Sequence, residues 1–160
     1  MLTREADYAV RIVLHLATCQ IKQETASAAR MAAALDVPYA FLRRILRRLT
    51  SQGLLVSRRG RKGGVALAKP SNTVSLLDVL RAIEQHKLCL NTCIATPGKC
   101  ARERLCPVYR SLVKTQQVID RSFAAISFYA LARHHMRLCR TRGGKISLKP
   151  TFPVADQPPA

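Results

Sequence analysis

The chain has 160 residues, with 27 Lys and Arg against 9 Asp and Glu, and its formal net charge at pH 7 is +18. This excess argues against most acidic or neutral enzyme classes and points to a polyanionic partner, either nucleic acid or an anionic membrane surface. Hydrophobic residues make up 48% of the chain, enough to form a core, which excludes wholesale disorder. The length suits one ordinary domain with appendages.

The location of the protein can be inferred from its apolar segments and its cysteines. The longest uncharged apolar stretch, residues 122–132, is far shorter than the roughly 20 residues that a bilayer span needs. The start MLTREAD carries acids where a signal peptide needs an apolar run. We therefore expect a cytoplasmic protein with no membrane partner. In that reducing compartment the six cysteines are interpreted first as metal ligands or redox groups.

The first 70 residues follow the pattern of three helices and a hairpin. Apolar residues recur at helical spacing over about residues 3–18, behind Thr3 as N-cap, and an alanine-rich second helix is predicted to stop at Asp36. A third helix is predicted from about Pro38 to Gln52, closed by Gly53. The runs LLVS and GVALA flank the basic segment RRGRKG, which predicts a hairpin with a basic tip. The predicted fold is mainly α, a winged helix-turn-helix.

The second half of the chain is expected to contain an arm and a tail. Ser75 is predicted to cap a short fourth helix, which completes a DNA-binding region over residues 1–85, and residues 86–106 form a cysteine-rich loop without periodicity. An apolar stripe beginning at Val108 predicts one long helix over residues 107–139, which needs a partner and favours a two-fold homodimer. Residues 140–160 are basic and then proline-rich, typical of a disordered tail.

The third helix has one apolar face and one arginine-rich face. From Val37 to Leu77 there are nine basic residues and no acid, whereas a solvated charged face usually mixes both signs. We interpret the segment as a DNA-binding surface for a palindromic double-stranded operator, because an α-helix fits the major groove and arginine bonds guanine edges. The residues expected to read bases are Tyr39, Ala40, Arg43 and Arg44; those expected to contact the DNA backbone are Arg47, Arg48, Arg58, Arg59, Arg61 and Lys62.

Four cysteines follow the spacing C-x3-C-x6-C-x5-C, namely Cys89, Cys93, Cys100 and Cys106. Thiolates favour iron–sulfur clusters or zinc. The spacing matches no common zinc finger, but a structural zinc loop and a thiol redox switch stay open as alternatives. Cys19 and Cys139 lie near predicted helix ends and are expected to be inert, half-buried thiols.

These segments together resemble a known family. The opening LTREADYAVRIVLHLA, the helix PYAFLRRILRRL, the wing RRGRKGGVALAKP and a downstream loop of three cysteines resemble the Rrf2 family of winged-helix regulators, including its IscR-like and NsrR-like iron–sulfur members. The resemblance covers about residues 1–135. It implies a homodimer formed through the C-terminal helix, with one [2Fe-2S] or [4Fe-4S] cluster per subunit. It assigns Cys93, Cys100 and Cys106 as ligands, although the first gap is six residues here and usually five in the family.

The resemblance leaves the fourth cluster ligand open. IscR-like members have a histidine three residues after the last cysteine, where this chain has Tyr109. NsrR-like members use an aspartate in the first helix of the opposite subunit, which corresponds to Asp7. The alternatives are an ion pair of Asp7 with Arg11, and Cys89 or, less favoured, His86 as the ligand.

The function that the resemblance implies is a cluster-dependent transcriptional regulator, expected to be a repressor that senses nitric oxide, oxygen, redox state or iron supply. The alternative is a DNA-binding regulator whose cysteine loop holds structural zinc or acts as a thiol redox group. We expect no enzyme, because the sequence has no paired carboxylates in one motif, no phosphate-binding loop and no nucleophile beside a base.

Overall fold

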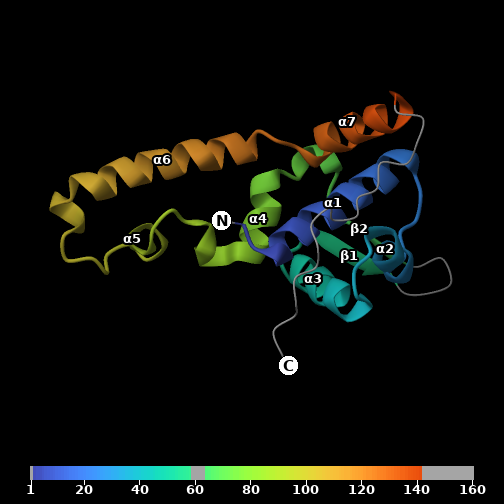
Figure 1. The fold of residues 1–160 in the computed structure, drawn as a ribbon, viewed down its shortest axis with the longest axis horizontal. Coiled ribbons are helices and arrows are strands. Elements are labelled where there is room, and N and C mark those ends of the chain that lie inside the picture. The colour runs from blue at the N-terminus through green and yellow to red at the C-terminus, as the bar shows by residue number, and fades with distance from the viewer. Residues whose placement is uncertain (1, 59–63, 142–160) are drawn as a thin grey trace.

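The computed structural model describes residues 2–58 and 64–141. Its helices and strands are, in chain order, α1 Arg4–Lys22, α2 Ala28–Leu35, α3 Tyr39–Ser51, β1 Leu55–Arg58, β2 Gly64–Leu67, α4 Leu76–Glu84, α5 Thr92–Ala95, α6 Pro107–Ala124 and α7 Phe128–Thr141. Three 3₁₀ turns, η1 Ser71–Thr73, η2 Gln85–Leu88 and η3 Glu103–Leu105, lie between them. This order confirms the mainly α, winged-helix fold (Figure 1).

The helix ends are set by local chemistry that the sequence shows directly. The Thr3 side chain accepts from the backbone N–H of Ala6, so the predicted N-cap of α1 is confirmed. Ser75 and Asp78 form a capping box at the start of α4. Asp36 takes the left-handed conformation, with φ of 55°, and ends α2. The helix α1 continues about one turn past its predicted end, as far as Lys22.

The body of the molecule is built around α1. This helix packs against α4, α7, α3 and β2, and its inner face, which includes Ile12 and Leu16, is buried. The predicted apolar face of α3 is buried too, at Leu42, Ile45 and Leu49. The two strands pair antiparallel with Leu55 opposite Leu67, and the Val65 N–H donates to the Ala26 carbonyl at 2.9 Å. The hairpin is thereby attached to the connection between α1 and α2.

The prediction of a single long helix over residues 107–139 is wrong. The described residues there form two helices, α6 and α7, with a break at residues 125–127. At the break the Ile126 carbonyl accepts from the Leu76 N–H at 2.8 Å, and the Phe128 N–H donates to the Val74 carbonyl at 2.9 Å. Phe128 is fully buried. These tertiary bonds and this burial outweigh the local preference for a continuous helix, so the chain turns and α7 packs on α1.

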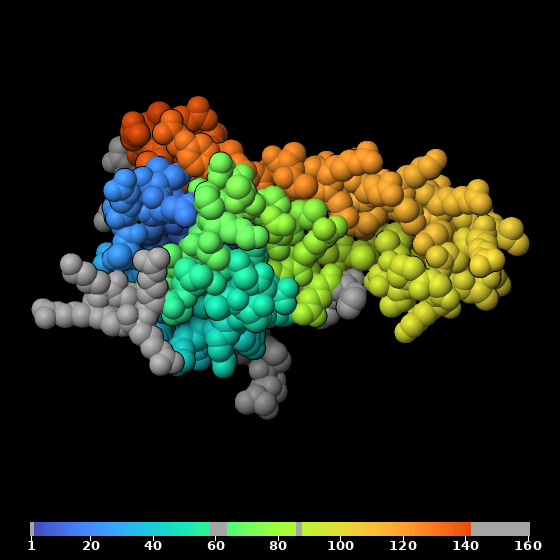
Figure 2. Space-filling view, turned by 180° about the vertical axis from the view of Figure 1, so that it is seen from behind, coloured from blue at the N-terminus to red at the C-terminus, as the bar shows by residue number. Residues whose placement is uncertain are grey.

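An elongated arm extends from the body (Figures 1 and 2). It consists of α6, with α5 and the cysteine-rich loop beside it. The arm is attached through the buried Gln116 of α6, whose Oε1 accepts from the Leu90 N–H at 2.9 Å and whose Nε2 donates to the Leu88 carbonyl at 3.2 Å. Asp120 accepts from Gln116 and also pairs with Arg81 of α4 at 2.9 Å. None of the helices within the described residues is long and apolar enough to cross a membrane.

Candidate DNA interface and cysteine loop

The helix α3 presents its N-terminal turn to solvent. Its N-cap is Pro38, whose side chain has no acceptor for the first backbone N–H groups, so the helix end keeps its positive partial charge outward. Tyr39 and Ala40 in this turn are exposed, and the guanidinium carbon of Arg43 lies over the Tyr39 ring, 5.9 Å from its centre. An exposed, electropositive helix end with an aromatic and a guanidinium is suited to nucleic acid.

A surface hollow lies between α3 and the hairpin. Tyr39, Arg43 and Arg47 line it from α3, and Ser57 and Val65 line it from the strands. Arg43 and Arg47 are exposed. In this hollow, residues of α3 that are predicted to contact bases or the DNA backbone lie next to the strands of the hairpin. A helix that binds in a DNA groove beside a wing requires this arrangement.

Arg44 and Arg48, on the other edge of α3, contact residues of the protein itself. Arg48 points to the body: its Nη2 donates to the Ile83 carbonyl at 2.6 Å and its Nη1 bonds Glu5 Oε2 at 3.1 Å. Arg44 is exposed but lies over the Phe41 ring, with its guanidinium carbon 5.0 Å from the ring centre, and its Nε is 3.7 Å from Glu5 Oε1. These contacts use two of the five N–H donors of Arg48 inside the protein, which opposes its predicted role in binding the DNA backbone.

The wing tip cannot be compared with the prediction. Arg59, Arg61 and Lys62 lie outside the described residues, as do the side chain of Arg58 and the predicted tail beyond residue 141. The strand β1 Leu55–Arg58 contacts α3 and pairs antiparallel with β2, so the two strands of the predicted hairpin are confirmed.

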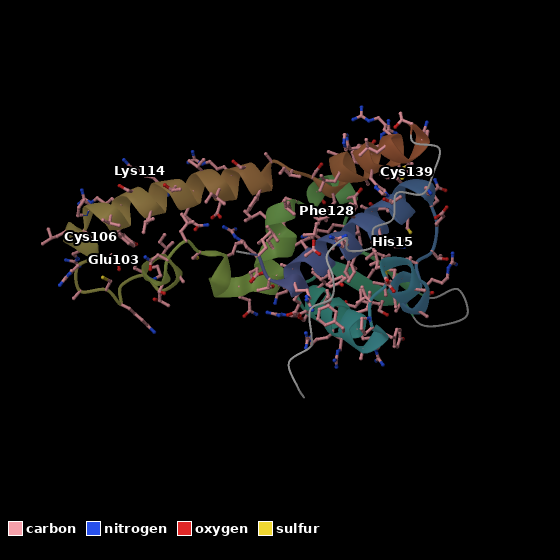
Figure 3. The ribbon with its side chains drawn as sticks, in the orientation of Figure 1. His15, Glu103, Cys106, Lys114, Phe128 and Cys139 are labelled. Atoms are coloured by element: carbon pink, nitrogen blue, oxygen red, sulfur yellow. The ribbon has the colours of Figure 1, made fainter. Side chains whose placement is uncertain are left out.

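The cysteine loop lies on the arm, away from α1. Figure 3 shows Cys106 and Glu103 at the far end of α6, separated from His15 and Cys139 in the body. Cys93 lies on the short helix α5, which contacts α6, and Cys100 is exposed. Cys106 is the N-cap of α6, and its Sγ accepts from the Tyr109 N–H at 3.3 Å.

A glutamate braces this loop, which the sequence did not reveal. Glu103 accepts from the Gly98 N–H at 2.6 Å and hydrogen-bonds the Tyr109 side chain, which raises the pKa of that phenol, with smaller contributions from burial and from the charges of Glu103 and Cys93. Tyr109 is thus bonded to Glu103 through its side chain and to Cys106 through its backbone N–H. These contacts of Glu103 connect Gly98 in the loop to Tyr109 on α6.

A profile of the Rrf2 family, described as an iron-dependent transcriptional regulator, matches residues 2–134. The chain belongs to the Rrf2 family. Membership in a family of transcriptional regulators agrees with the expectation that the chain is not an enzyme.

Known proteins agree with this assignment. NsrR of Oceanobacillus iheyensis, an HTH-type transcriptional regulator, is 30% identical over 104 residues, which cover 61% of this Rrf2 chain and 70% of that protein. The chain spans about half the length of several other curated relatives that it matches.

Two solved structures share the fold. T. potens IscR superposes with a TM-score of 0.64 at 17% identity, over 86% of this chain and 90% of that one. CymR, the global cysteine regulator of B. subtilis, gives a TM-score of 0.63 at 17% identity, over 84% and 97%. At these identities the likeness shows the fold of this Rrf2 protein.

The donor set of this Rrf2 protein fits an iron–sulfur cluster in its chemistry. The loop supplies three thiols on one segment, and Cys106 occupies a helix N-terminus, where negative charge is stabilised. In the described part of one chain, however, no three His, Cys, Asp or Glu side chains are close enough together to hold a metal ion. The loop therefore offers ligands of the right kind without a preformed metal geometry.

The candidates for a fourth ligand lie in two different places. Asp7 is on α1 in the body, half exposed, and forms the predicted i,i+4 pair with Arg11 at 2.9 Å. Cys89 is at the base of the arm, between the two residues whose backbone Gln116 holds. The side chain of His86 lies outside the described residues.

The two cysteines outside the loop are paired with histidines on α1 and α7. Cys19 Sγ lies 3.6 Å from His15 Nε2, and Cys139 Sγ lies 3.7 Å from His135 Nε2. Burial raises the pKa of the Cys19 thiol and lowers the pKa of His15 and of His135. Cys19 is buried and Cys139 is half-buried.

Proposed function

We propose that this Rrf2 protein is a homodimeric transcriptional repressor in the cytoplasm, and that an iron–sulfur cluster, one per subunit, controls its affinity for a palindromic DNA operator. The observation that carries the proposal is that one chain combines an exposed, acid-free arginine helix with a braced loop of three thiols. The family description as an iron-dependent transcriptional regulator supports the proposal, and so does the similarity to NsrR, an HTH-type transcriptional regulator.

In this proposal the body binds DNA and the arm binds the cluster. Tyr39, Arg43 and Arg47 border the hollow beside the wing and would meet base edges and phosphates. Cys93, Cys100 and Cys106 would hold the cluster. When bound, a cluster of this kind supplies chemistry that responds to nitric oxide, oxygen, redox state or iron supply.

The fourth ligand would come from a second chain. The arm carries the cysteine loop away from α1 of its own subunit (Figure 1), so Asp7 would reach a cluster only on the partner subunit. Such a bond would link the DNA-binding body of one subunit to the arm of the other. That link is a physical route by which the state of the loop changes the spacing of the two α3 helices.

The proposal is tested with protein prepared without oxygen. We expect iron, sulfide and visible absorbance in the wild type, and loss of all three in Cys93→Ser, with Cys139→Ser as the matched control that retains them. Binding of holo-protein and apo-protein to the same duplex is then compared by fluorescence anisotropy. Equal affinities would end the sensing proposal, and stoichiometric zinc in a colourless protein would favour the structural-zinc alternative.

The ligand question has its own comparison. Asp7→Asn is expected to alter the cluster spectrum, whereas Cys89→Ser is expected to leave it unchanged. Because the ion pair with Arg11 contributes only a few tenths of a kcal/mol, Asp7→Asn should leave the fold intact. An unchanged spectrum in Asp7→Asn together with a lost cluster in Cys89→Ser would assign Cys89 instead.

A further inference from the structure

The first turn of α1, the last turn of α4 and the recognition helix α3 meet at one hydrogen-bonded junction. Glu84 of α4 is only 4% exposed, and its Oε1 accepts from the Thr3 N–H at 2.7 Å and from the Thr3 hydroxyl at 2.6 Å. Next to it, the Ile83 carbonyl accepts from Arg48 Nη2 at 2.6 Å. The end of α4 is therefore bonded to both α1 and α3.

Glu5 closes this junction from α1. Its Oε2 bonds Arg48 Nη1 at 3.1 Å, and its Oε1 is 3.7 Å from the Nε of Arg44. The Oε1 atom is buried and has no hydrogen-bond partner in the described part of the chain. A buried carboxylate oxygen without a hydrogen bond is costly unless nearby cations compensate, and here two guanidiniums of α3 do so.

The two arginines are held to different degrees. Arg48 is fixed by a forked contact to Glu5 and to a backbone carbonyl. Arg44 is 58% exposed at its side chain, so it reaches solvent while it stays within the field of Glu5 and over the Phe41 ring. A single carboxylate thus limits the orientation of an arginine that faces outward.

We propose that Glu5 is a positioning residue for DNA recognition: it locks α3 to the body through Arg48 and aims Arg44 at the DNA. The proposal rests on the DNA-binding part of the proposed function and requires no cluster. Glu5 and Asp7 lie in the first turns of the same helix, so any displacement of this end of α1 would reach Arg44 and Arg48 through Glu5.

If Glu5 positions Arg44, its removal should change the preference for one DNA sequence. If Glu5 only lies near the interface, its removal should change the affinity for all sequences alike. A carboxylate that only lies near the interface repels phosphates, so its removal should strengthen binding to every DNA sequence. A carboxylate that orients an arginine should, when removed, weaken binding to the preferred sequence relative to others, because base recognition depends on guanidinium geometry.

The experiment uses protein prepared without oxygen, as in the test of the proposed function, and two probes. One is the duplex that the wild-type chain enriches from a randomised library, and the other is a scrambled duplex of the same length and composition. Glu5→Gln is expected to lower the ratio of the two affinities by about tenfold. The control Glu24→Gln removes the same charge from the exposed connection after α1 and should leave the ratio unchanged. Equal strengthening on both duplexes by Glu5→Gln would overturn the proposal.

Arg48→Lys provides a second measurement in which net charge stays constant. Lysine keeps the positive charge but cannot reproduce the forked bond to Glu5 and Ile83. We expect the affinity ratio to fall by about fivefold with an unchanged salt dependence, and urea unfolding to show that the variant is folded. An unchanged affinity ratio in Arg48→Lys would overturn the positioning role of Glu5. This measurement decides the question even if Glu5→Gln does not fold. If the wild type enriches no duplex, DNA recognition itself fails, which is a different outcome from a preserved ratio in the variants.

Discussion

Gly64 illustrates how one residue attaches the wing to the body. A Cβ at this position would lie 2.5 Å from the Ala26 carbonyl oxygen, which already accepts from the Val65 N–H at 2.9 Å. We expect Gly64→Ala to lower the free energy of unfolding by about 1–3 kcal/mol, measured in urea, and to speed amide exchange at Val65. Gly53→Ala is the control, since a Cβ there meets nothing within 4 Å and only its φ of +68° is unfavourable. Unchanged exchange at Val65 in Gly64→Ala would contradict this account.

His15 makes the stability of the body depend on pH. Burial is the largest influence on its pKa and lowers it; the charge of Glu24 opposes this, and nearby cations add to the lowering. The unfolded chain then takes up the proton first as pH falls, so the stabilising effect is complete above about pH 6.5 and is lost as pH falls through the folded pKa. The free energy of unfolding should fall between pH 7.5 and 5.5.

The pH prediction is tested by substitution of single histidines. His15→Gln should flatten the pH dependence partly, because burial lowers the pKa of His135 in the same direction. His134→Gln, at an exposed position of α7, should leave the slope unchanged. A slope that His15→Gln does not alter would show that His15 is not responsible.

The arginines of α3 show what a sequence reveals about single residues and what it does not. The period of the helix correctly separated the apolar face, including Leu42 and Ile45, from the arginines. It could not show where a long side chain ends. Arg48 turns to a carbonyl and a carboxylate that come from α4 and α1, far away in the chain, and only the tertiary structure brings these acceptors to it.

At the scale of elements, Phe128 is the largest buried side chain by which α7 is held to the body. Phe128 is fully buried, and its N–H is bonded to the Val74 carbonyl at 2.9 Å. Phe128→Ala is expected to cost about 3–5 kcal/mol of unfolding free energy and to speed hydrogen exchange throughout α7. Tyr129→Ala, next in the chain and 44% exposed, is the matched control and should have a small effect. A similar loss of unfolding free energy in both variants would contradict the special role of Phe128.

The elements of the body could be predicted well because their ends depend on local residues. Thr3, Ser75 and Asp36 act on N–H groups or dihedral angles within their own helix end. The break after α6 could not be predicted, since Ile126 continues the apolar stripe and its carbonyl is held by Leu76, about fifty positions earlier. The Glu103 brace was missed for a different reason: its partners Gly98 and Tyr109 are near in the chain, but a lone glutamate among loop cysteines has no periodicity that identifies them.

At the scale of the whole molecule, exposed apolar side chains on the arm favour a paired arrangement. The arm holds exposed apolar side chains on and beside α6, among them Val118, Val108 and Leu105, and an exposed apolar strip of this kind favours burial against a second copy. Two copies would present two α3 helices and two wings to one duplex. The positive charge of each chain would then add along the same DNA face.

This arrangement determines how binding should respond to salt. If a dimer neutralises six to ten phosphates, its affinity should fall by about 10³ to 10⁵ between 50 and 200 mM salt, because each contact releases condensed counterions. A plot of log affinity against log salt gives the number of contacts. Arg47→Ala should reduce that slope by about one per subunit. Arg48→Lys should leave the slope unchanged, because the positive charge is kept and Arg48 is bonded to Glu5 and to the Ile83 carbonyl. Binding that is independent of salt would exclude the phosphate backbone as the partner of the charge on α3.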